Sequence, residues 1–337
     1  YTPMMQQYLK TKEEYKDCIL FYRLGDFYEM FFDDAIVVSK ELELTLTGKS
    51  CGTEERAPMC GVPYHAVEGY LNKLVANGHK VAICEQVEDP KLAKGLVKRE
   101  VIRIVTPGTN TDMQALDESK NNYIMCIVYL ADKYGISLAD ISTGDYFVTE
   151  VDSERKLIDE INKFAPSEII CNESFYMSGV DLSDMKHRLG IAVYSLEAWY
   201  FSDETAENTL KEHFKVQSLE GLGLSDFACG TIAAGALLRY LYETQKNDLG
   251  NLSSIHPYST GKYMIIDSST RRNLELVETL REKQKRGSLL WVLDKTKTAM
   301  GARTLRAYVE QPLIDKDEIE LRQEAIAELN DHVITRE

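Results

Sequence analysis

A change in the pattern of apolar residues divides this chain of 337 residues. Up to about Gly230, short apolar runs typical of strands alternate with segments whose apolar residues recur at helical spacing. After Gly230 the pattern is helical only. A polar stretch over residues 109–120 makes a second division. Since domains usually hold about 100–200 residues, we expect separate units over residues 1–115, 116–250 and 251–337.

The first unit reads as a mixed α/β domain. Residues 18–23 predict a strand stopped by Gly25 and Asp26, and we expect a helix from there to about Leu42. Apolar residues from Val67 onward recur at helical spacing, and the pair Asn77-Gly78 ends that helix. Residues 81–84 and 101–105 predict two more strands.

The second unit opens with three strand-like runs, at residues 123–130, 134–141 and 145–151, with Gly135 and Gly144 as the expected turns. A helix over 155–164 and a strand over 168–171 follow. This order favours a ribonuclease-H-like α/β sheet. Helices are then predicted at 231–245, 273–286, 305–310 and 318–329, so the third unit is expected to be the start of an all-α domain.

The net charge of −15 is distributed unevenly. Residues 1–115 carry −3, residues 116–255 carry −12 and residues 256–337 carry zero. An acidic middle unit is repelled by phosphate, so a nucleic-acid partner would contact the flanking units. The seven cysteines are scattered without a CxxC pair, which favours free thiols in a reducing cytoplasm and no metal site. No apolar run approaches the ~20 residues that cross a bilayer, so we expect no membrane partner.

Six blocks of sequence, in a fixed order, carry a resemblance to a known family. Together they extend over nearly the whole chain, and a combination of this length is specific. On them the chain resembles the N-terminal part of the bacterial MutS family, whose members recognise DNA mismatches. The blocks are residues 1–9 (YTPMMQQYL), 21–29 (FYRLGDFYE), 58–66 (PMCGVPYHA), 82–86 (AICEQ), 105–109 (VTPGT) and 267–275 (DSSTRRNLE).

The resemblance implies that Phe27 stacks on a mispaired base and that Glu29 hydrogen-bonds to it. A phenyl wedge entering from the minor groove must unstack base steps, which costs a few kcal/mol per step. That cost is lowest where pairing is already defective. Composition alone favours a plainer interpretation. Phe27 would be one core aromatic among several, and Asp26 with Glu29 would form a capping box at the start of the helix.

Other contacts are implied by the same resemblance. Lys49 stands where the family has a basic residue near the DNA backbone, while Met59, Tyr64 and His65 belong to a block that approaches the same duplex edge. Each of these four is equally compatible with a packed loop residue. The basic run from Lys91 to Arg103 is more typical of a solvated face than of a phosphate track.

Three functional hypotheses follow for the units together. The resemblance implies a mismatch-binding domain, a connector and the start of a core or lever domain. It also implies partners: double-stranded DNA with mismatches or small loops, a second copy of the protein, and downstream repair factors such as MutL. A metal-dependent nuclease centred on Asp140 of the middle unit is one alternative. An interaction scaffold, in which Phe27 would be buried, is the other.

No catalytic residue is expected in this chain. A phosphate-cradling loop needs Gly, four residues, then Gly-Lys-Ser/Thr. The sequence Gly48-Lys49-Ser50 fails this test because Glu43 stands where the first glycine belongs. The resemblance places the family's ATP and Mg²⁺ site in a later domain, beyond residue 337, so we expect no cofactor here.

Overall fold

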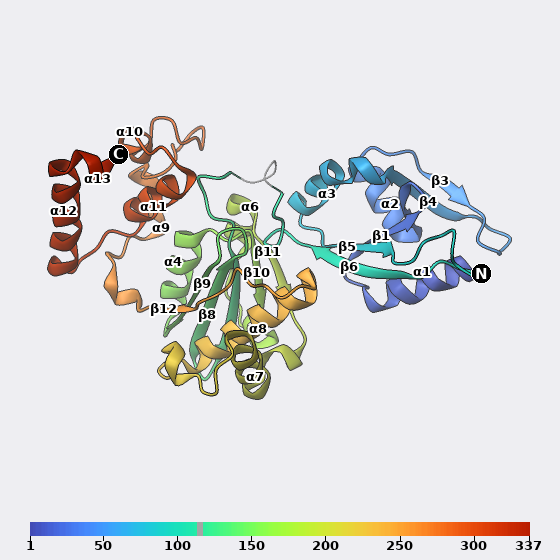
Figure 1. The fold of residues 1–337 in the computed structure, drawn as a ribbon, viewed down its shortest axis with the longest axis horizontal. Coiled ribbons are helices and arrows are strands. Elements are labelled where there is room, and N and C mark those ends of the chain that lie inside the picture. The colour runs from blue at the N-terminus through green and yellow to red at the C-terminus, as the bar shows by residue number, and fades with distance from the viewer. Residues whose placement is uncertain (113–116) are drawn as a thin grey trace.

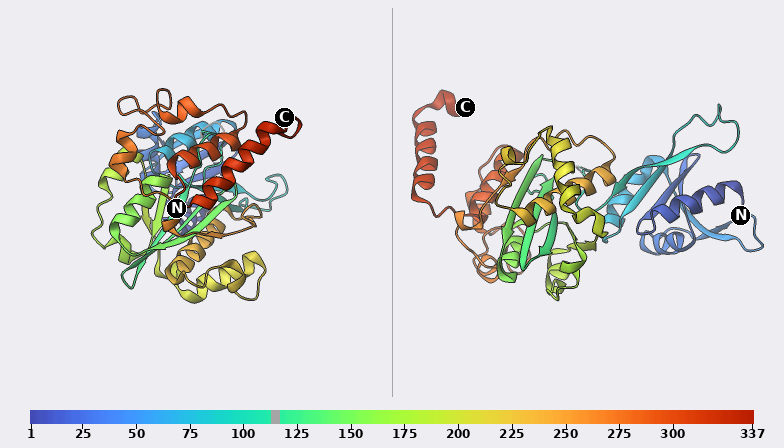
Figure 2. Two further views of the ribbon diagram at one scale, coloured as in Figure 1. Left: turned by 90° about the vertical axis from the view of Figure 1, so that its left-hand side faces the viewer. Right: turned by 90° about the horizontal axis from the view of Figure 1, so that it is seen from below.

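A computed structural model describes residues 1–112 and 117–337. The chain forms three parts arranged in a row, with the first and the third at opposite ends (Figure 1). The view from below in Figure 2 shows the same order. The boundary that we placed between residues 115 and 116 lies outside the described residues. None of the helices in the described ranges combines the length and the apolar character needed to cross a membrane.

The first part is a six-stranded mixed sheet with helices on both faces. The strand order is β3-β4-β2-β1-β5-β6, and β1 runs parallel to β5 while all other pairs are antiparallel. Helix α1 packs on one face, and α2 and α3 pack on the other. The bounds are α1 Pro3–Glu14, β1 Ile19–Leu24, β2 Phe27–Phe31, α2 Phe32–Glu41, β3 Thr47–Lys49, β4 Ala57–Pro63, α3 Val67–Ala76, β5 Val81–Gln86 and β6 Arg99–Val105.

The helix that we expected directly after Asp26 is wrong in its first turn and a half. Gly25 has φ +59°, and Gly25-Asp26 forms the tight turn of a hairpin in which Leu24 pairs with Phe27. The alternating aromatic and apolar residues of β2 then pair with β1 and β4, and the helix begins only at Phe32. The capping-box interpretation of Asp26 and Glu29 is therefore wrong, because Glu29 lies in the middle of a strand.

The second part is another six-stranded sheet, of order β11-β10-β7-β8-β9-β12. Strands β7, β8 and β9 form the expected antiparallel meander, and β10 joins β7 in parallel. The buried helix α8 covers one face with α7, while α4, α5 and α6 cover the other. The bounds are β7 Ile124–Leu130, β8 Lys133–Asp140, β9 Asp145–Val151, α4 Glu154–Phe164, β10 Glu168–Cys171, α5 Glu173–Tyr176, α6 Ser183–Leu189, β11 Ala192–Ser195, α7 Asp203–Phe214, α8 Ala228–Gln245 and β12 His256–Pro257.

Gly135 does not form a turn, as the sequence had indicated, but lies inside β8. The turn before it is made by Ala131 and Asp132, both with positive φ. Gly135 is instead the place where the sheet meets α8. A Cβ built there would lie 2.2 Å from the carbonyl oxygen of Cys229. The second expected turn, at Gly144 with φ +82°, is confirmed.

The third part is mostly helical, and one predicted helix is wrong. Residues 274–288 form turns, because Glu275 and Lys283 both adopt positive φ and interrupt any helix there. The amides of Leu289 and Leu290 donate back to the carbonyls of Glu275 and Leu276, which closes this segment into a loop. The bounds are α9 Ser268–Asn273, α10 Leu289–Leu293, α11 Ala299–Glu310, α12 Lys316–Asp331 and α13 Val333–Arg336.

Polar contacts join the first part to the second. The buried carboxylate of Glu168 accepts hydrogen bonds from the Gly108 amide at 3.1 Å and from the Tyr240 hydroxyl at 2.7 Å. The Tyr194 hydroxyl donates to the Gly78 carbonyl at 2.6 Å, and the ammonium of Lys80 lies 4.1 Å from the centre of the Tyr194 ring. These contacts fix the first sheet on the second through directed bonds.

The close approach at Gly135 generates a stability prediction. Gly135→Ala should lower the free energy of unfolding by about 1–3 kcal/mol or more, because backbone must move to admit the methyl group. Gly69→Ala is the matched control, since nothing lies within 4 Å of its Cβ position in α3. That change should stabilise the protein by roughly 0.5–1 kcal/mol. Urea unfolding of both variants measures this. An equal change in the free energy of unfolding for the two variants would contradict the close contact of Gly135 with the α8 backbone.

Candidate nucleic-acid interface

The first sheet has one face that is only partly covered. Side chains at alternate positions of a strand share a face, so Phe27, Glu29 and Phe31 point to the same side. Phe31 is fully buried against Met5 and Tyr8 of α1, whereas the Phe27 side chain is 47% exposed. Helix α1 therefore covers one end of this face and leaves the hairpin end open. The Phe27 ring stands there on a strand hydrogen-bonded on both sides.

Glu29 and Lys49 form an ion pair on this face. The Lys49 Nζ lies 2.6 Å from Glu29 Oε2, and the two side chains are 32% and 16% exposed. They come from β3 and β2, which are not neighbours, because β4 runs between them. No local sequence pattern indicates this contact, since the two residues are 20 positions apart.

Gly61 leaves the surface beside Phe27 and Glu29 without a side chain. It pairs with Glu29 across β4 and β2. A Cβ at this position would lie 3.2 Å from the Tyr28 carbonyl oxygen, 3.6 Å from Glu29 Cγ and 3.8 Å from Phe27 Cδ1. A side chain at position 61 would therefore press on the Tyr28 carbonyl and lie in van der Waals contact with Phe27 and Glu29.

Met59 lies on the same face, next to Phe31 and Thr47 in the strand register. It is half-buried, and its carbonyl accepts a hydrogen bond from the Thr47 hydroxyl at 3.4 Å. Of the six residues that the sequence singled out, four gather on this face: Phe27, Glu29, Lys49 and Met59.

Tyr64 and His65 lie on the other side of the hairpin end. The Tyr64 ring packs under the Arg23 guanidinium, 3.9 Å from ring centre to Cζ. Arg23 is held by Glu85 at 3.3 Å, and the Tyr28 hydroxyl donates to the same carboxylate. Burial, together with this carboxylate, raises the pKa of Tyr28. His65 is exposed beside Tyr64.

Tyr64 also secures the turn that presents Phe27. Its amide donates to the Asp26 carbonyl at 2.9 Å, which ties the end of β4 to the β1–β2 turn. The sequence leaves two interpretations of Tyr64 open, a contact with the duplex edge and a packed loop residue. The structure shows that part of its contact surface is already used within the protein.

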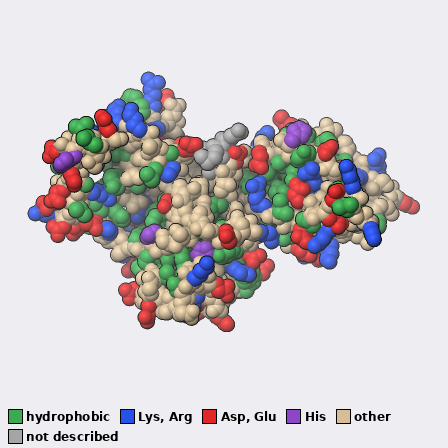
Figure 3. Space-filling model, viewed as in Figure 1, with side chains coloured by type: hydrophobic (Ala, Val, Ile, Leu, Met, Phe, Trp, Pro, Cys, Tyr) green, Lys and Arg blue, Asp and Glu red, His purple; other side chains and the backbone are tan. Residues whose placement is uncertain are grey.

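The basic run at 91–103 divides into two groups. Arg99 donates to the Arg23 carbonyl at 2.8 Å and to Gln7 at 3.0 Å, so it is part of the sheet's framework. Lys91 and Lys94 are exposed on the loop between β5 and β6. Because β5 runs parallel to β1, this loop lies at the same end of the sheet as Phe27. Figure 3 shows Lys and Arg side chains among acidic ones over this part of the molecule.

Asp140 is bonded as a structural carboxylate. Its Oδ1 accepts from the amide and hydroxyl of Ser142, and its Oδ2 accepts from the Asn121 side chain and the Asn122 amide, at 2.5–2.9 Å. Four donors leave little room for a metal ion on this fully buried side chain. Within residues 1–112 and 117–337, no three His, Cys, Asp or Glu residues are grouped to hold a metal. One further carboxylate, that of Asp145, lies beside Asp140, since its Oδ2 accepts from the same Asn121 amide at 2.9 Å. Two carboxylates bridged by an amide do not form the cluster that the nuclease alternative needs.

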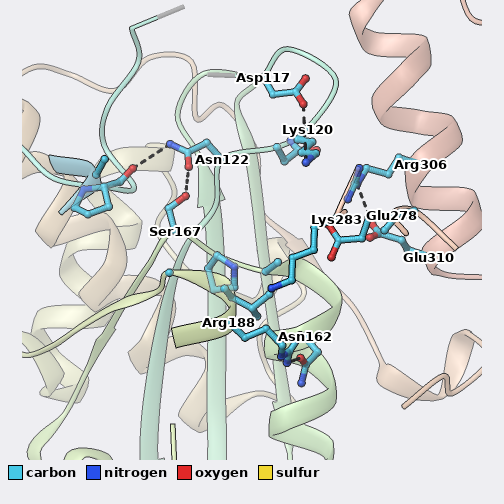
Figure 4. Close-up of a pocket in the computed structure, with 18 of the residues that line it drawn as sticks. Asp117, Lys120, Asn122, Asn162, Ser167, Arg188, Glu278, Lys283, Arg306 and Glu310 are labelled. Atoms are coloured by element: carbon cyan, nitrogen blue, oxygen red, sulfur yellow. Dashed lines mark hydrogen bonds and ion pairs between the residues drawn. The ribbon is translucent and has the colours of Figure 1, made fainter. Parts of the chain in front are cut away.

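A cavity of about 590 Å³ lies where the three parts meet, away from the Phe27 face (Figure 4). Its charged lining has six cations, Lys120, Arg188, Arg271, Arg272, Lys283 and Arg306, and three carboxylates, those of Asp117, Glu278 and Glu310. Arg306 pairs with Glu310 at 3.7 Å and Lys120 with Asp117 at 4.0 Å, while Arg188 donates to Asn162 at 2.6 Å. The lining of this cavity therefore carries an excess of positive charge.

Comparison with known proteins gives consistent matches along the chain. Residues 2–114 match the model of MutS domain I, residues 122–253 that of MutS domain II and residues 269–337 that of MutS domain III. The chain is 69% identical over 336 residues to the DNA mismatch repair protein MutS of Lachnoclostridium phytofermentans. It is 53% identical over 338 residues to the MutS of Acetivibrio thermocellus.

These alignments include all or nearly all of this chain but only 36% and 38% of the two relatives. The chain thus spans little more than a third of their length. The three matched domains follow in the family's order and together take in most of the sequence. The chain belongs to the MutS family and contains its domains I, II and III.

Proposed function

We propose that the open face of the first sheet recognises mismatched base pairs and small loops in double-stranded DNA. Phe27 acts as the wedge, and Glu29 accepts a hydrogen bond from the displaced base. The observation that carries this proposal is the half-exposed Phe27 ring on a strand fixed on both sides. Large apolar side chains on such a rigid, open position are typical of binding sites.

The chemistry of the two side chains fits a reader of many mismatches. An aromatic face stacks on any base, since every base has a π-face. Insertion is cheapest where pairing is already weak, so the wedge converts weak pairing into affinity. A carboxylate adds an acceptor for a hydrogen bond from the displaced base. The exposure of Phe27 also argues against the scaffold alternative, which needs this ring buried.

The other parts have supporting roles in this proposal. The middle part, with charge −12, stays off the DNA, and its meander followed by β10 fits the ribonuclease-H-like connector that the sequence predicts. Lys91 and Lys94 contact phosphate beside the wedge. Met59, Tyr64 and His65 remain candidates for the duplex edge. Pairing with a second copy, contact with MutL, and ATP and Mg²⁺ binding outside these residues belong to the full-length protein.

Phe27→Ala should abolish the preference for mismatched DNA in the full-length protein. The lost stacking is about 1–3 kcal/mol per base, which corresponds to roughly a fivefold to 150-fold loss in the affinity ratio. Fluorescence anisotropy with a mismatched and a matched duplex measures both affinities. An unchanged ratio in a folded variant would refute the wedge.

The same substitution should leave stability almost unchanged, by less than about 1 kcal/mol, since half of the ring already faces solvent. Phe31→Ala is the matched control, two residues along the same strand face and fully buried. It should cost about 3–5 kcal/mol. Thermal unfolding of both variants measures these stability losses and so distinguishes an aromatic residue exposed for binding from one buried in the core.

Glu29→Ala should strengthen binding to matched DNA and narrow the ratio between mismatched and matched binding. In matched DNA the carboxylate finds no base donor and repels phosphate, while its removal also frees the Lys49 ammonium. At a mismatch the lost charge-assisted hydrogen bond, about 1.5–3 kcal/mol, offsets this gain. Glu29→Gln should keep more mismatch affinity, because its amide oxygen still accepts. Weaker binding of matched DNA by a folded Glu29→Ala variant would overturn the repulsion argument.

A further inference from the structure

Lys49 is the partner that the Glu29 carboxylate has in the described part of the chain. The Nζ to Oε2 distance of 2.6 Å is that of a charge-assisted hydrogen bond, and both side chains are more than half shielded from solvent. The pair lies two residues from Phe27 along β2, on the same face. Lys49 is therefore already engaged before any DNA arrives.

The surrounding strands favour this arrangement. Lys49 pairs with the small residue Ala57 in the register, so its stem is free to extend across β4. The Lys49 ammonium, which bonds to Glu29, also lies 5.7 Å from the centre of the buried Phe31 ring and so makes a cation–π contact with it. Gly61 presents no side chain beside the Glu29 stem, where a Cβ would lie 3.6 Å from Glu29 Cγ.

We infer that Lys49 is a specificity-determining residue that acts as the counter-ion of Glu29, and not as a ligand of a DNA phosphate. The inference rests on the proposed function of Glu29. It differs from the role that the family resemblance implies for a basic residue at this position, which is contact with the DNA backbone.

The consequence differs between the two kinds of duplex. In matched DNA the Glu29 charge has no base donor, and Lys49 offsets part of its repulsion of phosphate. At a mismatch the base donates to Glu29, and the carboxylate, with two oxygens, can accept from both the base and Lys49. Removing Lys49 therefore exposes an unpaired charge mainly in the matched complex. Loss of Lys49 therefore widens the ratio of mismatched to matched affinity, whereas loss of Glu29 narrows it.

The test is a double-mutant cycle in the full-length protein with Lys49→Gln, Glu29→Gln and both together. With Glu29 present, Lys49→Gln should widen the ratio of mismatched to matched affinity by roughly two- to fivefold, as expected for a partly exposed ion pair. In the Glu29→Gln background it should leave that ratio unchanged. Lys49→Met, which keeps the apolar stem, repeats the comparison if Lys49→Gln unfolds.

The affinities for the two duplexes, compared separately, give a second readout. A lysine that neutralises one phosphate supports binding to matched and mismatched DNA alike, so its loss weakens both by the same factor. With Glu29 present, Lys49→Gln should weaken binding to matched DNA by roughly two- to fivefold and leave binding at the mismatch nearly unchanged. In the Glu29→Gln background, where the ammonium is free to contact phosphate, it should weaken both equally. An equal loss for both duplexes with Glu29 present would make Lys49 a phosphate ligand and overturn the inference.

The control is Lys40→Gln, an exposed lysine on α2, which packs on the opposite face of the sheet. It should change neither affinity nor their ratio. Failure of the proposed function is seen separately, as an absence of mismatch preference in the unsubstituted protein. Failure of the inference is seen instead as an equal loss of affinity for both duplexes in Lys49→Gln, beside an intact mismatch preference in the unsubstituted protein.

Discussion

The hydrogen-bonded register of β2 between β1 and β4 is the constraint on which the candidate interface depends. Leu24 and Pro63 flank Phe27, and Tyr22 and Gly61 flank Glu29. Because side chains alternate across a sheet, a slip of one residue would send Phe27 and Glu29 into the core and bring Tyr28 and Met30 out. The tight turn at Gly25 and the hydrogen bond from Tyr64 to Asp26 hold this register at its end. Cores on both faces of the sheet hold it along the strand.

Seven of the strands were predictable, because short β-branched and aromatic runs give a clear local signal: β1, β5, β6, β7, β8, β9 and β10. Strands β3, β4, β11 and β12 were not predicted. Strand β2 was missed since it passes into α2 through Phe32, which takes φ +54° without a glycine or proline to mark the change. The mixed-charge segment at 273–286 has helical spacing, yet Glu275 and Lys283 interrupt it with a backbone conformation that the sequence does not signal. Local pattern alone does not foresee such positions.

The candidate site was predictable only in part. The resemblance to the family singled out Phe27 and Glu29, whereas composition alone favoured a core aromatic and a capping residue. What could not be read is the pairing of Glu29 with Lys49, since it depends on β4 lying between their strands. The sequence also does not show that Tyr64 and Phe27 lie on opposite faces of the sheet. Both residues are at the hairpin end, but Tyr64 packs under Arg23 on the face away from Phe27.

Phe27 lies on a strand that is paired on both sides and not on a flexible loop, and this affects how the protein responds to a force on the ring. A ring on a loop would yield locally, whereas strand β2 passes any load through its hydrogen bonds to β1 and then to β5 and β6. Strand β6 leads directly to Gly108, which is bonded to the buried Glu168 of the second part. A force on Phe27 would therefore reach the Gly108–Glu168 and Gly78–Tyr194 hydrogen bonds between the first two parts. In the complex that we propose, the stiffness of the bent DNA would load those bonds.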